Sequence, residues 1–204
     1  MALSIDTYAL GPTQTNCYVV RSGPDASEAV VIDPGFEVEP PGFGVAAILV
    51  THCHWDHLGG IASLAQATGA PVYMAEREAA VLEDPSAFYP DQQIPPHSPD
   101  VRLEGGDTVE VAGLSFDVVD VPGHSPGHIA FAADGVLFSG DLLFAGGVGR
   151  TDLPFADWDT LVASIRSLLD RFPPDTVVYP GHGPSTTLGA ERDGNPFLAE
   201  LRAS

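Results

Sequence analysis

The stretch Thr51-His52-Cys53-His54-Trp55-Asp56-His57-Leu58-Gly59-Gly60 carries four side chains of metal-ligand type within six residues. It directly follows the apolar run 45–50, which is typical of a buried strand. His52 and His54 are two residues apart, so an extended backbone points both to the same side. Asp56 and His57 then begin a predicted helix whose apolar face is formed by Leu58, Ile61, Leu64 and Ala65. One turn thus offers two pairs of ligands, which suits two adjacent metal ions better than a polar surface turn.

Length and composition predict a single well-buried domain over residues 1–204. Hydrophobic residues make up 44% of the chain, which supplies a sizeable core and argues against disorder. The formal net charge is −20, with 28 acidic and 8 basic residues and no lysine. Such a charge disfavours non-specific binding to nucleic-acid phosphates.

Cysteine content and the N-terminus favour a cytoplasmic protein that binds no membrane. Cys17 and Cys53 are the only cysteines, so there is no disulfide framework. Residues 1–10 lack the basic flank and long apolar core of a signal peptide, and no window reaches the length of a membrane span. We expect Cys53 to be a small buried residue and Trp55 to serve in packing.

The same pattern of strand, turn and ligand recurs along the chain. His124 follows the predicted strand 114–119, Asp141 follows 136–139, and His182 follows 176–179. Turns at strand ends place side chains at the rim of a sheet, where clefts form. If these strands leave their sheets at one edge, five histidines and two aspartates meet there, and that set suits zinc or iron.

Several single residues leave alternatives open. Asp33 ends the predicted strand 28–32 and either caps its turn or steadies a metal-bound histidine. His128 competes with His124, but strand residues follow it at once, which favours His124. His97 lies among prolines in the excursion 84–100, where we expect it to be solvated.

Periodicity and turn residues predict the remaining elements. Further strands are expected at residues 3–8, 16–21, 72–74, 101–103, 108–111 and 129–132. Helices are expected at 75–82 and 157–172, the second with an apolar stripe of Trp158, Leu161, Ile165, Leu168 and Leu169. The glycine-rich loop 146–152 is no phosphate loop, because no lysine follows its glycines.

The ordered motifs resemble the metallo-beta-lactamase superfamily and, within it, the single-domain glyoxalase II-like (hydroxyacylglutathione hydrolase-like) hydrolases. The matching segments run almost end to end: VIDPG (31–35), THCHWDHLGG (51–60), PGHSPGH (122–128), FSGDLLF (138–144), GRTD (149–152), PGHG (180–183) and NPFL (195–198). The set is specific for the superfamily and much less specific for a substrate.

The resemblance implies an α/β (α+β) fold, a four-layer αββα sandwich of two mixed sheets flanked by helices, with the site at one edge of the sheets. It also implies two divalent metal ions, expected to be Zn²⁺, with iron or manganese as the alternatives. The implied ligands are His52, His54 and His124 for one metal, Asp56, His57 and His182 for the other, and Asp141 for both.

Three departures from the resembling enzymes bear on the substrate. Residues 36–44 leave no room for the helix that members usually carry there. We do not expect the C-terminal helical domain with which longer glyoxalase II enzymes hold glutathione. Arg150 keeps the basic charge found near their glutathione site, but no tyrosine follows it closely. Arg150 is therefore the candidate for substrate binding.

The implied chemistry is hydrolysis of small-thiol thioesters, such as an S-2-hydroxyacylglutathione. A hydroxide that bridges two metals is a nucleophile at neutral pH, and a thiolate departs without a strong general acid. Asp56 is the candidate catalytic residue, because its free carboxylate oxygen can accept or shuttle a proton. The expected partner is thus a small-molecule thioester.

Other functions fit the same motifs. Iron-dependent persulfide oxidation needs a single iron on two histidines and one aspartate, which would be His52, His124 and Asp141. Hydrolysis of lactones or beta-lactams uses similar chemistry, whereas the acidic surface disfavours phosphodiesters. A non-enzymatic metal-binding domain would require a closed site without a water ligand.

Overall fold

The computed structural model describes residues 3–38 and 42–202, and its centre is a pair of six-stranded sheets. The strands of the first sheet lie in chain order: β1 (Ser4–Leu10), β2 (Thr15–Arg21), β3 (Glu28–Ile32), β4 (Gly44–Val50), β5 (Val72–Ala75) and β6 (Val101–Leu103). Strands β1 to β3 are antiparallel, and β3 to β6 are parallel. The sheet is therefore mixed, as expected.

The second sheet is also mixed. Its spatial order is β14 (Thr186–Thr187), β13 (Val177–Pro180), β10 (Val136–Gly140), β9 (Ile129–Ala133), β8 (Leu114–Asp120) and β7 (Thr108–Val111). Strands β10 and β13 are parallel, and the other pairs are antiparallel. A separate hairpin consists of β11 (Leu143–Phe144) and β12 (Gly147–Val148).

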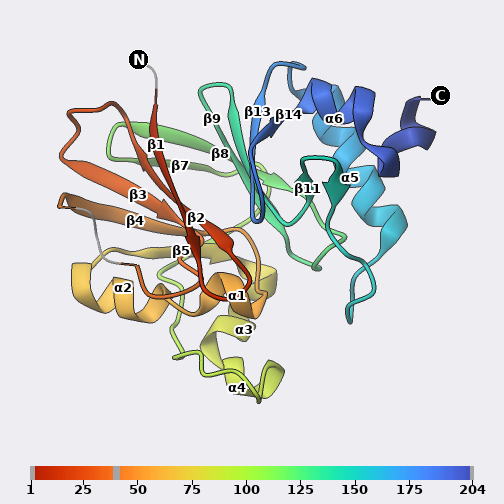
Figure 1. The fold of residues 1–204 in the computed structure, drawn as a ribbon. Helices are drawn as coiled ribbons and strands as arrows, with labels where there is room; N and C mark the ends of the chain where they lie inside the picture. The colour runs from red at the N-terminus through yellow and green to blue at the C-terminus, as the bar shows by residue number, and fades with distance from the viewer. Residues whose placement is uncertain (1–2, 39–41, 203–204) are drawn as a thin grey trace.

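Helices cover the outer faces of both sheets (Figure 1). The first sheet carries α1 (Trp55–Leu58), α2 (Ile61–Thr68), the 3₁₀ turn η1 (Glu76–Glu78), α3 (Ala79–Glu83) and α4 (Pro85–Phe88) on its side of the molecule. The second sheet carries α5 (Trp158–Arg171), α6 (Leu188–Gly194) and the 3₁₀ segment η2 (Pro196–Arg202). The layers are thus helix, sheet, sheet, helix, and the fold class expected from the sequence is confirmed.

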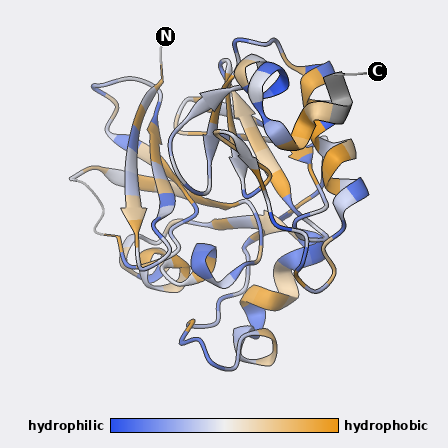
Figure 2. Cartoon of the chain, turned by 45° about the vertical axis from the view of Figure 1, so that its right-hand side comes forward, coloured by the Kyte–Doolittle hydropathy of each residue, from blue (hydrophilic) through white to orange (hydrophobic). Residues whose placement is uncertain are grey.

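Strand alternation divides the hydrophobic residues among three cores. Along β2, Tyr18 and Val20 face the second sheet, whereas Cys17 and Val19 face the helices of the first. A third core lies between the second sheet and α5 and α6. Figure 2 shows the hydrophobic colour recurring along the strands of both sheets. Burial on both faces explains why these strands read as nearly continuous apolar runs.

Two predicted helices are interrupted in the structure. The helix expected from Asp56 onward ends at Leu58 and restarts at Ile61, although its four apolar residues are buried as predicted. The break follows from close backbone packing: a Cβ on Gly60 would lie 2.1 Å from the carbonyl oxygen of Phe36. The predicted helix 75–82 divides into η1 and α3, and the predicted excursion 84–100 contains the short helix α4.

Helix α5 follows its sequence signals closely. Asp157 caps it, accepting a hydrogen bond from the Thr160 amide at 2.8 Å, and Leu161, Ile165 and Leu168 are fully buried. Trp158 was expected on this buried stripe, but it lies in the first turn of the helix and is 41% exposed.

Two other expectations concern length. Among the described residues, no helix is long and apolar enough to cross a membrane. Of the shortened segment 36–44, residues 39–41 lie outside the described part of the chain, and the described remainder forms no helix.

Candidate metal centre

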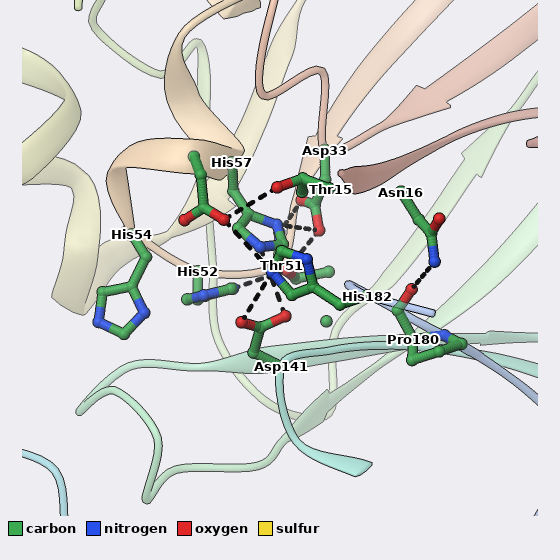
Figure 3. A network of polar contacts seen from close by, with 12 residues as sticks. Thr15, Asn16, Asp33, Thr51, His52, His54, His57, Asp141, Pro180 and His182 are labelled. Carbon is green, nitrogen blue, oxygen red and sulfur yellow. Dashed lines mark hydrogen bonds and ion pairs between the residues drawn. The ribbon is translucent and has the colours of Figure 1, made fainter. Parts of the chain in front are cut away.

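The candidate ligands are carried to one place by the ends of strands from both sheets. His52 follows β4, Asp141 follows β10 and His182 follows β13, while His124 lies in the turn between β8 and β9. A β-bridge between Thr15 and His182 joins the two sheets at this edge. Asn16 reinforces the junction, because its side chain donates to the Pro180 carbonyl at 2.9 Å (Figure 3).

The first group of candidate ligands consists of His52, His54 and His124, and we call it the histidine set. One ring nitrogen from each lies within 4.8 Å of those of the other two. His54 Nδ1 faces His124 Nε2 at 2.7 Å. His52 and His54 point to the same side of the extended segment after β4, in agreement with their spacing of two.

The second group consists of Asp56, His57 and His182, and we call it the mixed set. Its ligand atoms also lie within 4.8 Å of one another. Asp56 and His57 come from α1, and His182 Nε2 approaches Asp56 Oδ2 at 3.3 Å. Thr15 donates a hydrogen bond to the same oxygen of Asp56 at 2.9 Å.

Asp141 lies between the two sets (Figure 3). Its Oδ2 is 3.5 Å from His124 Nε2 and 3.4 Å from His182 Nε2, and its Oδ1 is 3.4 Å from His57 Nε2. Space for this carboxylate depends on a glycine, since a Cβ on Gly181 would lie 2.0 Å from Asp141 Oδ1. The structure therefore brings all seven predicted ligand residues together.

Hydrogen bonds on the far side of four rings fix which nitrogen faces the centre. The Nδ1 atoms of these histidines have the following acceptors: Thr51 Oγ1 for His52, Asp33 Oδ2 for His57, the Arg150 carbonyl for His124 and the Thr13 carbonyl for His182. An Nδ1–H that donates to these oxygens leaves the lone pair on Nε2. In the neutral form of each of these four rings, the lone pair on Nε2 is thus directed at the centre, as metal ligation by imidazole requires.

Unpaired buried atoms test whether the centre fits a metal. Among the described residues, His52 Nε2, His57 Nε2 and Asp141 Oδ1 are buried without a hydrogen-bond partner. Buried polar atoms without partners are costly and rare in folded proteins. Imidazole nitrogens and carboxylates are the donors that zinc and iron accept. The donor set and its unpaired atoms fit cations at this position.

The histidines of the two sets have pKa values shifted in opposite directions, by burial in the histidine set and by carboxylates in the mixed set. Burial lowers the pKa of His52 far below its usual range, and burial likewise lowers the pKa of His54 to about 4. Burial would also lower the pKa of His182, but hydrogen bonds to Asp141 and Asp56 raise it to about 10. Burial of Asp56 is outweighed by His182 and His57, which lower its pKa to about 2.

Asp33 contacts both the strand that carries the motif and one of the histidines. Its carboxylate accepts hydrogen bonds from the Thr51 amide at 2.8 Å and the Thr51 hydroxyl at 2.6 Å. It also accepts from His57 Nδ1 at 3.0 Å. Of the two roles left open for Asp33, these contacts favour orientation of a candidate ligand.

Glu78 was missed by the sequence reasoning and ties together the two loops of the histidine set. It is 2% exposed and accepts from the Cys53 amide at 2.5 Å, between His52 and His54. It also accepts from Ser125 Oγ at 2.5 Å and the Gly127 amide at 2.8 Å, beside His124. Burial raises the pKa of Glu78. In the predicted helix 75–82, Glu78 is a charged residue on the apolar face with Ala75, Ala79 and Leu82. This exception to the pattern could have identified Glu78 from the sequence.

The centre opens into a cleft of about 940 Å³ with a largely apolar wall. The apolar lining residues are Trp55, Val81, Ala87, Phe88, Pro126, Phe144, Val148, Leu153, Pro154 and Phe155. Arg150 lines the cleft, as expected for a substrate contact, but both its Nε and Nη2 bind Asp152, at 2.7 and 2.8 Å.

The remaining predicted residues lie as follows. His128 is fully buried, with its ring centroid 4.7 Å from that of His52, and it is in none of the candidate ligand groups. His97 lies 3.9 Å from Asp100 and is partly exposed. Cys53 is buried, as expected, and Trp55 packs edge-on against Phe36 while also lining the cleft.

Comparison with known proteins settles the family. The profile of the metallo-beta-lactamase superfamily matches residues 10–182. The chain belongs to the metallo-beta-lactamase superfamily. The family match indicates a metal-dependent hydrolase, and the His/Asp centre described above agrees with metal binding.

Three individual superfamily members illustrate the range of similar proteins. Hydroxyacylglutathione hydrolase GloC of Haemophilus influenzae is 32% identical over 218 residues, covering 96% of this chain and 98% of its own. The structure of the BLEG-1 B3 metallo-beta-lactamase has a TM-score of 0.86 at 36% identity, covering 96% of this chain and 100% of its own. TTHA1623, solved in a di-iron-bound form, has a TM-score of 0.81 at 44% identity, with 95% and 100% coverage.

Proposed function

We propose that this superfamily member hydrolyses thioesters of small thiols, with S-2-hydroxyacylglutathione as the representative substrate. One observation carries the proposal: seven ligand-type side chains converge beside a large cleft in which the hydroxyl groups of Tyr89 and Ser125 are already engaged in hydrogen bonds. The name of the relative GloC, a hydroxyacylglutathione hydrolase, supports the same substrate class.

The proposed centre holds two cations, one on the histidine set and one on the mixed set, with Asp141 shared. Zn²⁺ is the expected ion, and the di-iron form of TTHA1623 makes iron the alternative. When bound, the cations supply a water that ionises near pH 7 and a positive charge for the thioester carbonyl oxygen.

Asp56 is the proposed catalytic residue of the chain itself. Its low pKa of about 2 keeps the carboxylate ionised at neutral pH, so it accepts a proton rather than donating one. Thr15 holds Oδ2 of this carboxylate by its hydrogen bond. Asp33 keeps the ring of His57 oriented toward the centre.

The hydroxyl and thiol groups that line the cleft bear on the choice of leaving group. Among the described residues that line it, Tyr89 donates its hydroxyl to the Cys53 carbonyl and Ser125 donates to Glu78. Burial also raises the pKa values of Tyr89 and of the Cys53 thiol. A thiol leaving group has a pKa of about 8.5 and departs as the thiolate, whereas an amide nitrogen needs a proton. The arrangement therefore favours thioesters over amides.

The direct test is release of free thiol from S-lactoylglutathione by the zinc-loaded protein. The control is the double variant His54→Ala, Asp56→Ala, checked for folding by circular dichroism. We expect thiol release by the parent chain and at least a thousandfold loss in the control, about the scale of losing a key catalytic group. Equal rates for the two proteins would refute thioester hydrolysis.

Iron-dependent persulfide oxidation on His52, His124 and Asp141 is the second candidate. The di-iron form of TTHA1623 shows that a similar protein binds iron, whereas this candidate needs a single iron. Metal analysis with oxygen uptake distinguishes it: one iron per chain and oxygen consumption with a persulfide favour it, and two zinc ions argue against it. Because the chain is similar to the BLEG-1 beta-lactamase, a beta-lactam and a lactone are tested as further substrates in the same assays. Metal binding without turnover in any of these assays would indicate a binding domain.

A further inference from the structure

The eight basic residues of the chain are all arginines, and most of those described are neutralised by a neighbour. Arg21, Arg102, Arg150, Arg171 and Arg192 each form an ion pair with an aspartate or glutamate. Among the residues whose side chains the structure describes, Arg77 and Arg166 have no such partner. Of these two, only Arg77 lines the cleft above the candidate metal centre.

The position of Arg77 is fixed by its neighbours, although its guanidinium is exposed. Its Cβ lies against the turn that carries His124, since a Cβ on Gly127 would lie 2.7 Å from Arg77 Cβ. The next residue, Glu78, is anchored by its three hydrogen bonds to the loops of the histidine set. The short turn η1 therefore holds a buried carboxylate against the centre and a free cation on the cleft wall.

An arginine without an acidic partner is unusual in a chain of such negative charge, so its position in the cleft points to an anionic ligand. A chain with a net charge of −20 repels anions from most of its surface, and the second cation on the cleft wall, Arg150, is bound at both ends of its fork by Asp152. Arg77 keeps its guanidinium donors available for a planar anion such as a carboxylate, or for a phosphate.

We infer that Arg77 binds an anionic group on the thiol carrier of the substrate and so selects charged carriers over neutral ones. The inference rests on the proposed thioester hydrolysis. Because the reacting carbonyl is expected at the floor, beside Asp141, an exposed residue on the wall meets the carrier rather than the acyl group. Glutathione supplies carboxylates and coenzyme A supplies phosphates, so both carriers present the required chemistry.

The experiment uses one acyl group on three carriers with the zinc-loaded full chain. The substrates are S-lactoylglutathione, lactoyl-coenzyme A and the uncharged S-lactoyl-N-acetylcysteamine. Arg77→Gln is compared with Arg77→Lys and with Arg166→Gln, a matched control on α5 that removes the other unpaired arginine away from the cleft. Steady-state KM and kcat are measured for each pair.

We expect Arg77→Gln to raise KM about tenfold for the carrier whose anion it binds, with kcat changed less than about twofold. KM for the uncharged carrier stays unchanged, Arg77→Lys recovers part of the loss, and Arg166→Gln behaves like the parent. Whether glutathione or coenzyme A shows the effect tells a carboxylate from a phosphate. An unchanged KM for both charged carriers, or an equal loss on all three, overturns the inference.

A binding measurement separates this inference from the proposed function. S-methylglutathione is a thioether that cannot be hydrolysed, and its affinity for the zinc-loaded protein is measured by calorimetry. Arg77→Gln should weaken binding about tenfold, and added salt should diminish the difference, as for any exposed charge pair. If the parent hydrolyses no thioester, the proposed function fails, and equal S-methylglutathione affinities for parent and variant would then reject the role of Arg77 as well.

Discussion

The two halves of the metal centre differ in how they hold protons. In the histidine set, burial without a dominant carboxylate lowers the pKa values of His52, His54 and His124, so these rings are neutral at physiological pH. In the mixed set, Asp141, Asp33 and Asp56 raise the pKa values of His57 and His182 in spite of burial.

The histidine set can therefore bind a cation without losing protons, whereas the mixed set carries protons that a cation has to displace. A neutral imidazole binds a metal without releasing a proton, but a protonated one must lose its proton first. The carboxylates of the mixed set are balanced by imidazolium rings until a divalent ion takes their place.

Removing the residue shared by both halves should abolish the contrast. Asp141→Asn keeps the size of the side chain but removes the charge that faces His57, His124 and His182. We expect thioester hydrolysis to fall by about a thousandfold or more, together with the affinity for both metals. Activity and metal content are measured on the same preparation, and a variant with full metal content and near-parent activity would contradict the shared role.

Removing one ligand from each half should separate the halves. His124→Gln and His182→Gln are each expected to lower activity by about a hundredfold and to leave one metal per chain instead of two. The remaining metal should lie in the mixed set in the first variant and in the histidine set in the second. Spectra of the cobalt-substituted proteins distinguish these environments, and identical spectra would show that the two halves bind as one unit.

Glu78→Gln should weaken the histidine set selectively. The two carboxylate oxygens of Glu78 each accept a hydrogen bond from a backbone amide, that of Cys53 or that of Gly127. A glutamine has only one side-chain oxygen, so one of these two amides loses its acceptor. We expect the affinity of the histidine set for zinc to fall about tenfold to a hundredfold, with the mixed set unchanged.

The matched control for Glu78 is Glu76→Gln, on the same turn. Glu76 is exposed and pairs with Arg102, so its loss should alter neither metal site. Competition with a fluorescent zinc chelator measures both affinities. Equal effects of the two variants would assign Glu78 a general role in stability instead.

The smallest expected effect concerns the stability of the metal-free chain at alkaline pH. His182 has a folded pKa of about 10, above its ordinary value of 6.5, so its stabilising contribution is complete below pH 6.5 and lost as the pH rises to 10. We expect the free energy of unfolding to fall on the order of 1 kcal/mol over this range, allowing for solvent screening. Urea titrations measure it, and His182→Gln should flatten the profile, whereas an equally steep profile would argue against the ion pairs.

Much of the fold could be predicted because its signals are local. Strands β3, β6 and β7 were predicted with their observed bounds, and most other strands to within one or two residues, since apolar runs and turn residues act over a few positions. The helix break at Gly59–Gly60 could not be predicted, because it results from the close approach of residues 34–36, which lie more than twenty positions earlier in the chain.

The sequence by itself determined the inventory of the centre: the spacing of His52, His54, Asp56 and His57, and the strand-end positions of the later ligands, are properties of neighbouring residues. Only the tertiary structure decided what surrounds them. Thr15 meets Asp56 across 41 positions, and Glu78 joins loops 25 and 49 positions away. These pairings depend on how two sheets meet at one edge, and a hydrogen bond between distant segments leaves no periodic trace in either of them.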